Sequence, residues 1–228
     1  TAGDMKLLSG KKIGIGRVGD PPYHMAVSLL RKYGIAARDV QWVSIGVDAA
    51  TRAAALQSGL VDAALITAPA YFRLQSAGLP VLAVLLDHED IYVSTYYLFR
   101  RDALARERPT ALAFIKAHAE AIKRFYDDKS FAAETLIKYG GTRDLDDANR
   151  VYDLFRKARV LEPIPYALKG SIDAVIERQG QDLKGTDFSK MIDNSLVDQL
   201  VKEKYFEAVF GPSIRDEQQR KQAMAFGR

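Results

Sequence analysis

The 228-residue chain contains no cysteine. This absence excludes disulfide frameworks, cysteine-rich zinc sites, thiol nucleophiles and iron–sulfur clusters, but it does not choose between cytoplasm and periplasm. Long hydrophobic runs are also missing, because a run such as 81–86 is far shorter than the roughly 20 residues needed to cross a bilayer. A chain of this length can nevertheless bury a sizeable core without covalent staples.

The chain has little excess of charge of either sign. Thirty-three Lys and Arg residues stand against 29 Asp and Glu residues, which gives a formal charge of +4, and the two signs are interspersed. A nucleic-acid-binding domain would gather its basic residues on one face. We therefore expect no nucleic-acid partner.

Motifs for metal binding and catalysis are absent as well. His24, His88 and His118 share no helical or strand spacing with one another or with a ligand cluster. The sequence also has no Gly-x-Ser-x-Gly elbow for a serine nucleophile. We predict no catalytic residue, no metal and no cofactor.

The first ninety residues alternate between short β-type and helix-type segments, a pattern typical of a parallel sheet covered by helices in an α/β fold. Asp20 precedes two prolines, which is typical of an N-cap and a first helical turn, and Gly34 and Gly59 are typical of helix ends. Strands are predicted over 11–16, 40–45, 61–67 and 79–86, and helices over 21–33, 49–58 and 69–78.

Beyond residue 90 the pattern changes. Residues 91–99 are rich in aromatic and β-branched side chains, which predicts one more strand. The chain after it has almost no strand signal and is predicted to be mainly helical. Helices are predicted from Pro109 through Phe125 and over 131–139, 144–158, 169–178 and 194–203.

Gly14, Gly16 and Gly19 match the spacing of a dinucleotide-binding loop between a strand and a helix. The carboxylate that would bind the ribose is missing from the end of the second predicted strand, which reads Ser44-Ile45-Gly46. A nucleotide site is therefore disfavoured.

Three predicted turns, at 16–20, 46–48 and 67–69, lie at the carboxyl edge of the sheet and lead into helices. Ligands of open α/β sheets bind at this edge, where main-chain N–H groups and helix dipoles favour anionic or strongly polar groups. We predict a ligand site there, with an Arg fork for a carboxylate or sulfonate. The candidate ligand-binding residues are Arg17, Gly19, Asp20, Tyr23, Asp48, Thr67 and Pro69, with Tyr96 and Tyr97 as flat walls or hydroxyl donors.

Segments 8–15 (LSGKKIGI), 53–64 (AAALQSGLVDAA) and 193–198 (DNSLVD) resemble the solute-binding proteins of ABC importers in the nitrate, sulfonate, taurine and thiamine-precursor class. The resemblance covers about residues 6–206 and is most specific around 56–64. It implies a type II periplasmic-binding-protein fold, in which two α/β lobes close on a ligand and then dock on a membrane permease. It also implies a periplasmic location, or an extracellular one with a lipid anchor.

The resemblance implies a division of the chain. Residues 1–90 are expected to form the family's second lobe, 91–99 a hinge strand between lobes, and 100–210 a helical part of the first lobe. Residues 211–228 are expected to form a polar tail. Since the sequence begins where the second lobe should begin, we expect the N-terminal part of lobe one to be lacking, and self-association through the later helices could then cover their apolar faces.

The turn before the first predicted helix also differs from the family. The family usually offers hydroxyl residues there, and this chain offers 19–22 (GDPP), which disfavours sulfonate or nitrate and favours a ligand with a hydrogen-bond donor or positive group. The expected function is binding of a small polar organic ligand or anion and its delivery to an ABC permease. The alternatives are a ligand-sensing regulatory module and, third, an enzyme of the thiamine-precursor type, which the lack of cysteine disfavours.

Overall fold

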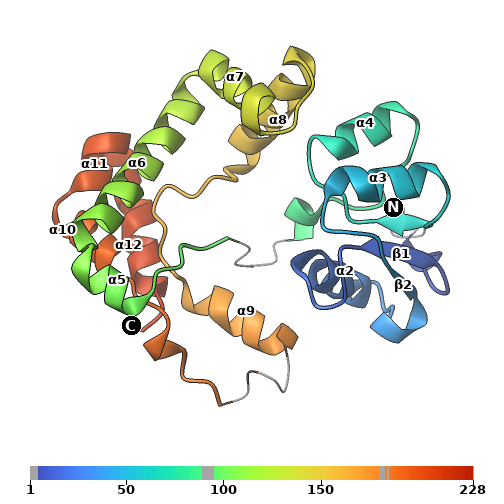
Figure 1. Cartoon of the computed structure of the whole chain (residues 1–228), viewed down its shortest axis with the longest axis horizontal. Coiled ribbons are helices and arrows are strands. Elements are labelled where there is room, and N and C mark those ends of the chain that lie inside the picture. The colour runs from blue at the N-terminus through green and yellow to red at the C-terminus, as the bar shows by residue number, and fades with distance from the viewer. Residues whose placement is uncertain (1–4, 89–94, 180–182, 184, 228) are drawn as a thin grey trace. The chain divides into compact units, whose positions relative to one another are not determined.

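The computed structural model describes residues 5–88, 95–179, 183 and 185–227 (Figure 1). The chain divides into two compact units. Unit 1 comprises residues 1–90 with 141–143, and unit 2 comprises residues 91–140 with 144–228. The assignment of these units to particular lobes of a binding protein stays a prediction.

Unit 1 contains a three-stranded parallel sheet in the order β2-β1-β3. In its register, Ile13 lies opposite Trp42 on one side and Ala63 on the other. The three strands that were predicted first are confirmed, although the third is reduced to two residues. The strands are β1 (Lys12–Ile15), β2 (Gln41–Ser44) and β3 (Ala63–Ala64).

The helices of unit 1 begin and end close to the predicted positions, because their caps are local signals. Asp20 and Asp48 are N-caps, and Gly34 and Gly59 follow the helix ends with positive φ. The α-helices are α2 (Pro21–Lys32), α3 (Ala49–Gln57) and α4 (Ala70–Ser76), with 3-10 helices η1 (Ala37–Asp39) and η2 (Leu85–His88).

The predicted fourth strand over 79–86 is wrong. Residues 79–84 form no strand, and η2 begins at Leu85. Pro80 lacks the N–H that a sheet ladder needs, and Leu82 and Ala83 pack against the core of unit 1 instead. The apolar run therefore reflects burial and not strand pairing.

Two separate apolar clusters lie in unit 1. One joins Ile13 of β1 to Leu30 of α2, and the other joins Ala53 of α3 to Ala70 and Leu74 of α4. Separate clusters are expected when helices cover both faces of a parallel sheet. The α/β, type II periplasmic-binding-protein-like fold class is confirmed.

Unit 2 is helical throughout most of its described residues (Figure 1), and the predicted helices are confirmed. Of the predicted strand 91–99, residues 91–94 lie outside the described residues and 95–99 form no strand. The helices are α5 (Arg101–Arg106), α6 (Arg108–Asp127), α7 (Lys129–Tyr139), α8 (Leu145–Ala158), α9 (Lys169–Gln179), α10 (Ser195–Lys202), α11 (Tyr205–Phe210) and α12 (Arg215–Met224), with 3-10 helices η4 (Phe188–Lys190) and η5 (Pro212–Ile214).

The apolar stripe of α6 packs inside unit 2. Its buried residues Ala111, Ile115 and Ala119 share one cluster with Leu200 of α10 and Phe206 of α11. This part of the later helices is therefore covered within the chain, and self-association through them stays a prediction. No described helix has the length and apolar character that a membrane span requires.

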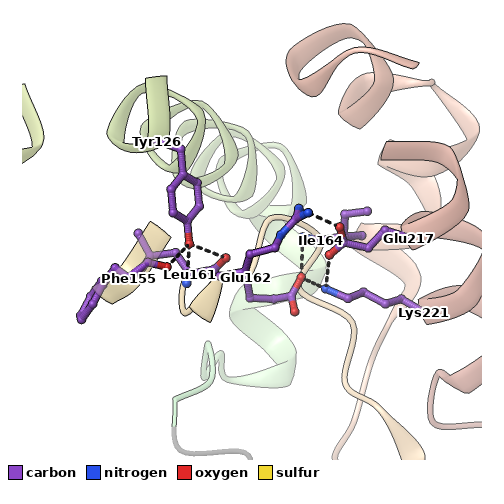
Figure 2. A network of polar contacts seen from close by, with 8 residues as sticks. Tyr126, Phe155, Leu161, Glu162, Ile164, Glu217 and Lys221 are labelled. Carbon is purple, nitrogen blue, oxygen red and sulfur yellow. Dashed lines mark hydrogen bonds and ion pairs between the residues drawn. The ribbon is translucent and has the colours of Figure 1, made fainter. Parts of the chain in front are cut away.

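The expected polar tail is a folded element. Residues 212–224 form η5 and α12, with Ile214 and Ala225 buried. Lys221 is 8% exposed and forms ion pairs with Glu162 and with Glu217, the latter at 2.9 Å from Nζ to Oε1 (Figure 2). The sequence of α12 looks polar because one of its buried positions holds Lys221. Glu162 and Glu217 neutralise the charge of this lysine.

Candidate functional site

The carboxyl ends of β1, β2 and β3 lead into the three predicted turns of unit 1, 16–20, 46–48 and 67–69. We call these turns the carboxyl edge. The backbone of the first turn touches the second, because a side chain added at Gly16 would meet Val47 Cα at 3.3 Å. The carboxyl edge is the candidate site.

The first turn is closed by its own aspartate. Asp20 is 6% exposed; its Oδ2 accepts a hydrogen bond from the N–H of Arg17 at 3.0 Å, and its Oδ1 accepts one from the N–H of Tyr23 at 2.8 Å. Asp20 therefore serves as a cap, and its carboxylate is turned toward the protein. The Arg17 side chain is exposed, and Gly19 has a φ of 87°, which favours glycine.

The second turn uses the same device. Asp48 Oδ2 accepts hydrogen bonds from the N–H and the hydroxyl of Thr51, both at 3.0 Å. The Thr51 backbone N–H, followed by its hydroxyl, lowers the pKa of the exposed Asp48 carboxyl below its ordinary value. An ionised carboxylate consequently stands at the N-terminus of α3.

These caps change the expected chemistry of the carboxyl edge. Main-chain N–H groups at the helix N-termini were expected to bind the ligand. In α2, Pro21 and Pro22 have no N–H, and the N–H of Tyr23 already donates to Asp20. In α3, the N–H of Thr51 donates to Asp48. These two N–H groups are engaged by carboxylates of the chain itself.

Beneath the turns lies Arg52, which sequence reasoning missed. The residue is 2% exposed; Nε donates to the carbonyl of Leu65 at 3.0 Å, and Nη1 donates to the carbonyls of Gly46 at 3.0 Å and Val47 at 2.8 Å. One guanidinium therefore joins the chain leaving β2 to the chain leaving β3. The signal in the sequence was a lone charge in an alanine-rich helix, four residues after the cap Asp48.

The third turn is less constrained by side chains. Pro69 is the N-cap residue of the seven-residue α4 and supplies no side-chain hydrogen bond, and the Ala68–Pro69 peptide is cis. Thr67 is exposed, and its carbonyl accepts a hydrogen bond from the N–H of Tyr71 at 3.3 Å. The Thr67 hydroxyl is thus placed at the surface of the carboxyl edge.

The three candidate tyrosines lie in different surroundings. Tyr23 packs edge-on against Trp42, with ring centroids 4.8 Å apart. Tyr97 belongs to unit 2, where its ring packs edge-on against Phe114, and burial raises the pKa of its phenol. Tyr96 is also in unit 2 and is 71% exposed. Only Tyr23 belongs to the same unit as the carboxyl edge.

Two exposed aliphatic side chains complete the described surface of these turns, and sequence reasoning missed both. Val18 is 62% exposed and Val47 is 77% exposed. Among the described residues, no group of three or more His, Asp or Glu side chains could hold a metal ion. The carboxyl edge therefore offers apolar tips, a guanidinium and a hydroxyl for contact with a small molecule.

A parallel sheet in the order β2-β1-β3 is common to many α/β folds, and the match to a solved periplasmic binding protein gives this chain its type II periplasmic-binding-protein-like class. The chain belongs to the family described as NMT1/THI5 like, whose model matches residues 3–130. This match confirms the resemblance to the solute-binding class that the sequence motifs indicate. No curated protein matches the chain significantly.

Two solved structures share the fold. A protein from Bordetella bronchiseptica RB50 is 21% identical, with a TM-score of 0.59 over 88% of this chain and 66% of its own. A structure described as the periplasmic sulfonate-binding protein SsuA of a sulfonate ABC transporter, from Methylobacillus flagellatus KT, is 20% identical, with a TM-score of 0.61 over 89% of this chain and 63% of its own. The chain spans less than two thirds of the length of either.

Proposed function

We propose that the chain is the solute-binding component of an ABC importer, which binds a small organic ligand at the carboxyl edge and delivers it to a membrane permease outside the cytoplasm. Membership of the NMT1/THI5 like family and the likeness to a structure described as a periplasmic sulfonate-binding protein support this proposal. The geometric observation behind it is that three strand-to-helix turns meet at the carboxyl edge of a parallel sheet, where such sheets bind ligands.

In this proposal the ligand contacts Arg17, Gly19, Thr67 and Pro69 directly. Asp20 and Asp48 act as caps that fix the turns, and Tyr23 supports the first turn from its contact with Trp42. Tyr96 and Tyr97 belong to unit 2, and their role as ligand contacts stays a prediction. The bound ligand is released unchanged, so the protein has no catalytic role.

Ligand binding by the full chain tests the proposal. Trp42 is the sole tryptophan and lies in β2, so its fluorescence reports on unit 1. Thermal shift and Trp42 fluorescence are measured with nitrate, methanesulfonate, a pyrimidine, an aromatic acid and an amine. We expect saturable binding of at least one class, and mass spectrometry should recover that ligand unchanged.

Arg17→Ala should weaken this binding. Arg38→Ala is the matched control, because Arg38 is also exposed but lies in η1, before β2, at the amino end of the sheet. Absence of binding by every class, or equal effects of the two variants, would contradict the proposed site. Turnover of a bound ligand would favour an enzyme instead.

A further inference from the structure

We propose that Tyr97 anchors the chain at its entry into unit 2 by packing between the rings of Phe114 and His118, and that protonation of His118 opens this packing. Tyr97 belongs to the first described segment of unit 2, residues 95–99. We call the rings of Phe114 and His118 the ring slot. The inference goes beyond the proposed function, because it concerns unit 2 alone and does not depend on the carboxyl edge.

The ring slot lies on one face of α6. Phe114 and His118 are four residues apart, so their side chains lie one above the other on the helix. The Tyr97 ring stands edge-on to both, with its centroid 5.1 Å from that of Phe114 and 5.5 Å from that of His118. Tyr97 also packs against the apolar cluster that joins α6 to α10 and α11. Its neighbours Tyr96 and Leu98 are 71% and 85% exposed, so Tyr97 fixes this segment to the helix.

The ring slot favours an uncharged imidazole. His118 is half-buried, and burial lowers the pKa of its imidazole, while the negative charge of Glu162 opposes this effect less strongly. The Glu162 carboxylate is already engaged, because its Oε1 accepts a hydrogen bond from the N–H of Ile164 at 2.9 Å and forms an ion pair with Lys221 (Figure 2). The carboxylate that would stabilise an imidazolium thus already neutralises a lysine.

Other charged side chains around α6 have partners away from the ring slot. Lys116 and Glu120 are each two positions from His118, about 200° around the helix. Lys116 pairs with Glu203, and the Tyr205 hydroxyl donates to Glu120. Described groups on the elements packed against α6 are paired as follows: Asp102 with Arg100 and Arg106, Arg124 with the Phe131 ring, Asp198 with Tyr166, Arg108 with Gln199, and Glu217 with Lys221.

Acid should therefore open the ring slot. The folded-state pKa of His118 is depressed, so its packing stabilises unit 2 above the unfolded-state pKa of about 6.5, and this stabilisation is lost as the pH falls through the lower folded-state value. An imidazolium regains hydration by turning toward solvent. Tyr97 then loses one of its two ring partners, and the chain at the entry of unit 2 is released.

Nuclear magnetic resonance of the full chain between about pH 8 and pH 5, a range that brackets an ordinary histidine, tests the coupling of the two rings. With signals assigned through bonds, the Tyr97 ring signals should move with the same midpoint as the His118 imidazole signals. Tyr97→Leu should raise the His118 midpoint, because the imidazole becomes more hydrated. Tyr96→Leu is the matched control, since Tyr96 is the exposed neighbour, and it should leave the midpoint unchanged.

Urea unfolding followed by far-UV circular dichroism tests the effect on unit 2. His118→Phe keeps a ring in the slot but cannot titrate, so it should lose less stability than the wild type over the same pH range. His88→Phe is the matched control, because His88 packs edge-on against Tyr33 at 6.0 Å in unit 1. This control should keep the wild-type pH profile of unit 2.

Three results would overturn the inference: Tyr97 ring signals that stay fixed while His118 titrates, a His118 midpoint that Tyr97→Leu does not change, or parallel pH profiles for the wild type and His118→Phe. The first measurement uses the wild-type chain alone, so it decides the matter even where a variant fails to fold.

Discussion

The carboxylate of Asp20 lies so close over Gly16 that a side chain at Gly16 would place its Cβ 2.1 Å from Asp20 Oδ2. The glycine at the end of β1 is therefore required by the cap of the following helix. Gly16 and the Asp20 cap depend on each other, because the absence of a side chain at Gly16 leaves room for the buried Asp20 carboxylate. This arrangement gives Gly16, one of three glycines spaced like those of a nucleotide loop, a role in packing.

Gly16→Ala should destabilise unit 1 by about 1–3 kcal/mol, because the added methyl group must displace the Asp20 carboxylate or the backbone of Val47. The backbone of Gly16 is not in the left-handed region, so the effect is one of space and not of φ. Urea unfolding followed by Trp42 fluorescence measures it. The exposed helical variant Gln57→Ala should change the midpoint little, and an equally stable Gly16→Ala protein would refute the close packing.

Arg52→Met should lower the free energy of unfolding of unit 1 by about 2–4 kcal/mol, since it leaves the carbonyls of Gly46, Val47 and Leu65 without their donor. Arg52→Lys should recover part of this loss, because an ammonium can serve some of these acceptors. The same fluorescence assay applies. Arg38→Met, at an exposed position, is the control; a loss as large as that of Arg52→Met would argue against a specific role for Arg52.

Asp48 should contribute to the pH dependence of unit 1. Its folded-state pKa is depressed, so its stabilisation is present above the unfolded-state pKa of about 4 and is lost as the pH falls through the lower folded-state value. Asp48→Asn keeps an oxygen acceptor at the N-cap but cannot titrate. The variant should therefore lose less stability than the wild type between pH 5 and pH 2, values chosen for the assay as roughly bracketing this titration.

Chemical denaturation at these pH values, followed by Trp42 fluorescence, makes the comparison. Asp87→Asn is the control, because Asp87 is exposed and lies in η2, away from the three turns. Parallel pH profiles for wild type and Asp48→Asn would show that the Asp48 carboxylate is not held in its ionised form by Thr51.

Lys221→Met should destabilise unit 2 by about 1–3 kcal/mol. The side chain of Lys221 is 10% exposed, and its removal takes from Glu217 one of two described ion-pair partners, the other being Arg159 at 3.0 Å. The penalty is moderated because the Glu162 side chain is 48% exposed and can be solvated. Unfolding followed by far-UV circular dichroism detects the loss, with the exposed Lys202→Met as control.

The features that could be predicted from sequence are those set by contacts between residues close together along the chain. Asp20, Asp48, Gly34 and Gly59 fix helix ends through bonds within a few residues, so three strand–helix units and their carboxyl edge could be placed from sequence. The helix predicted from Pro109 through Phe125 was equally clear, because its apolar residues recur at helical spacing, and Ile115, Ala119, Ile122 and Phe125 are buried in the structure.

Long-range interactions account for what was missed. The 79–86 segment is apolar like a strand, but a strand also needs a partner for its main-chain groups, and Pro80 has no N–H to donate to one. The α12 segment looks like a polar tail until Glu162, 59 residues earlier, is placed beside Lys221. Arg52 acts on carbonyls of two different strand ends, and no spacing along the chain reveals that convergence.

The caps at Asp20 and Asp48 have a thermodynamic consequence for recognition. Because each turn is held by bonds internal to the chain, its backbone conformation is already selected in the unliganded protein, and association loses little conformational entropy in unit 1. The first two turns are thus preorganised, and under the proposed function differences in affinity among ligands should arise from their own contacts and desolvation rather than from remodelling of these turns.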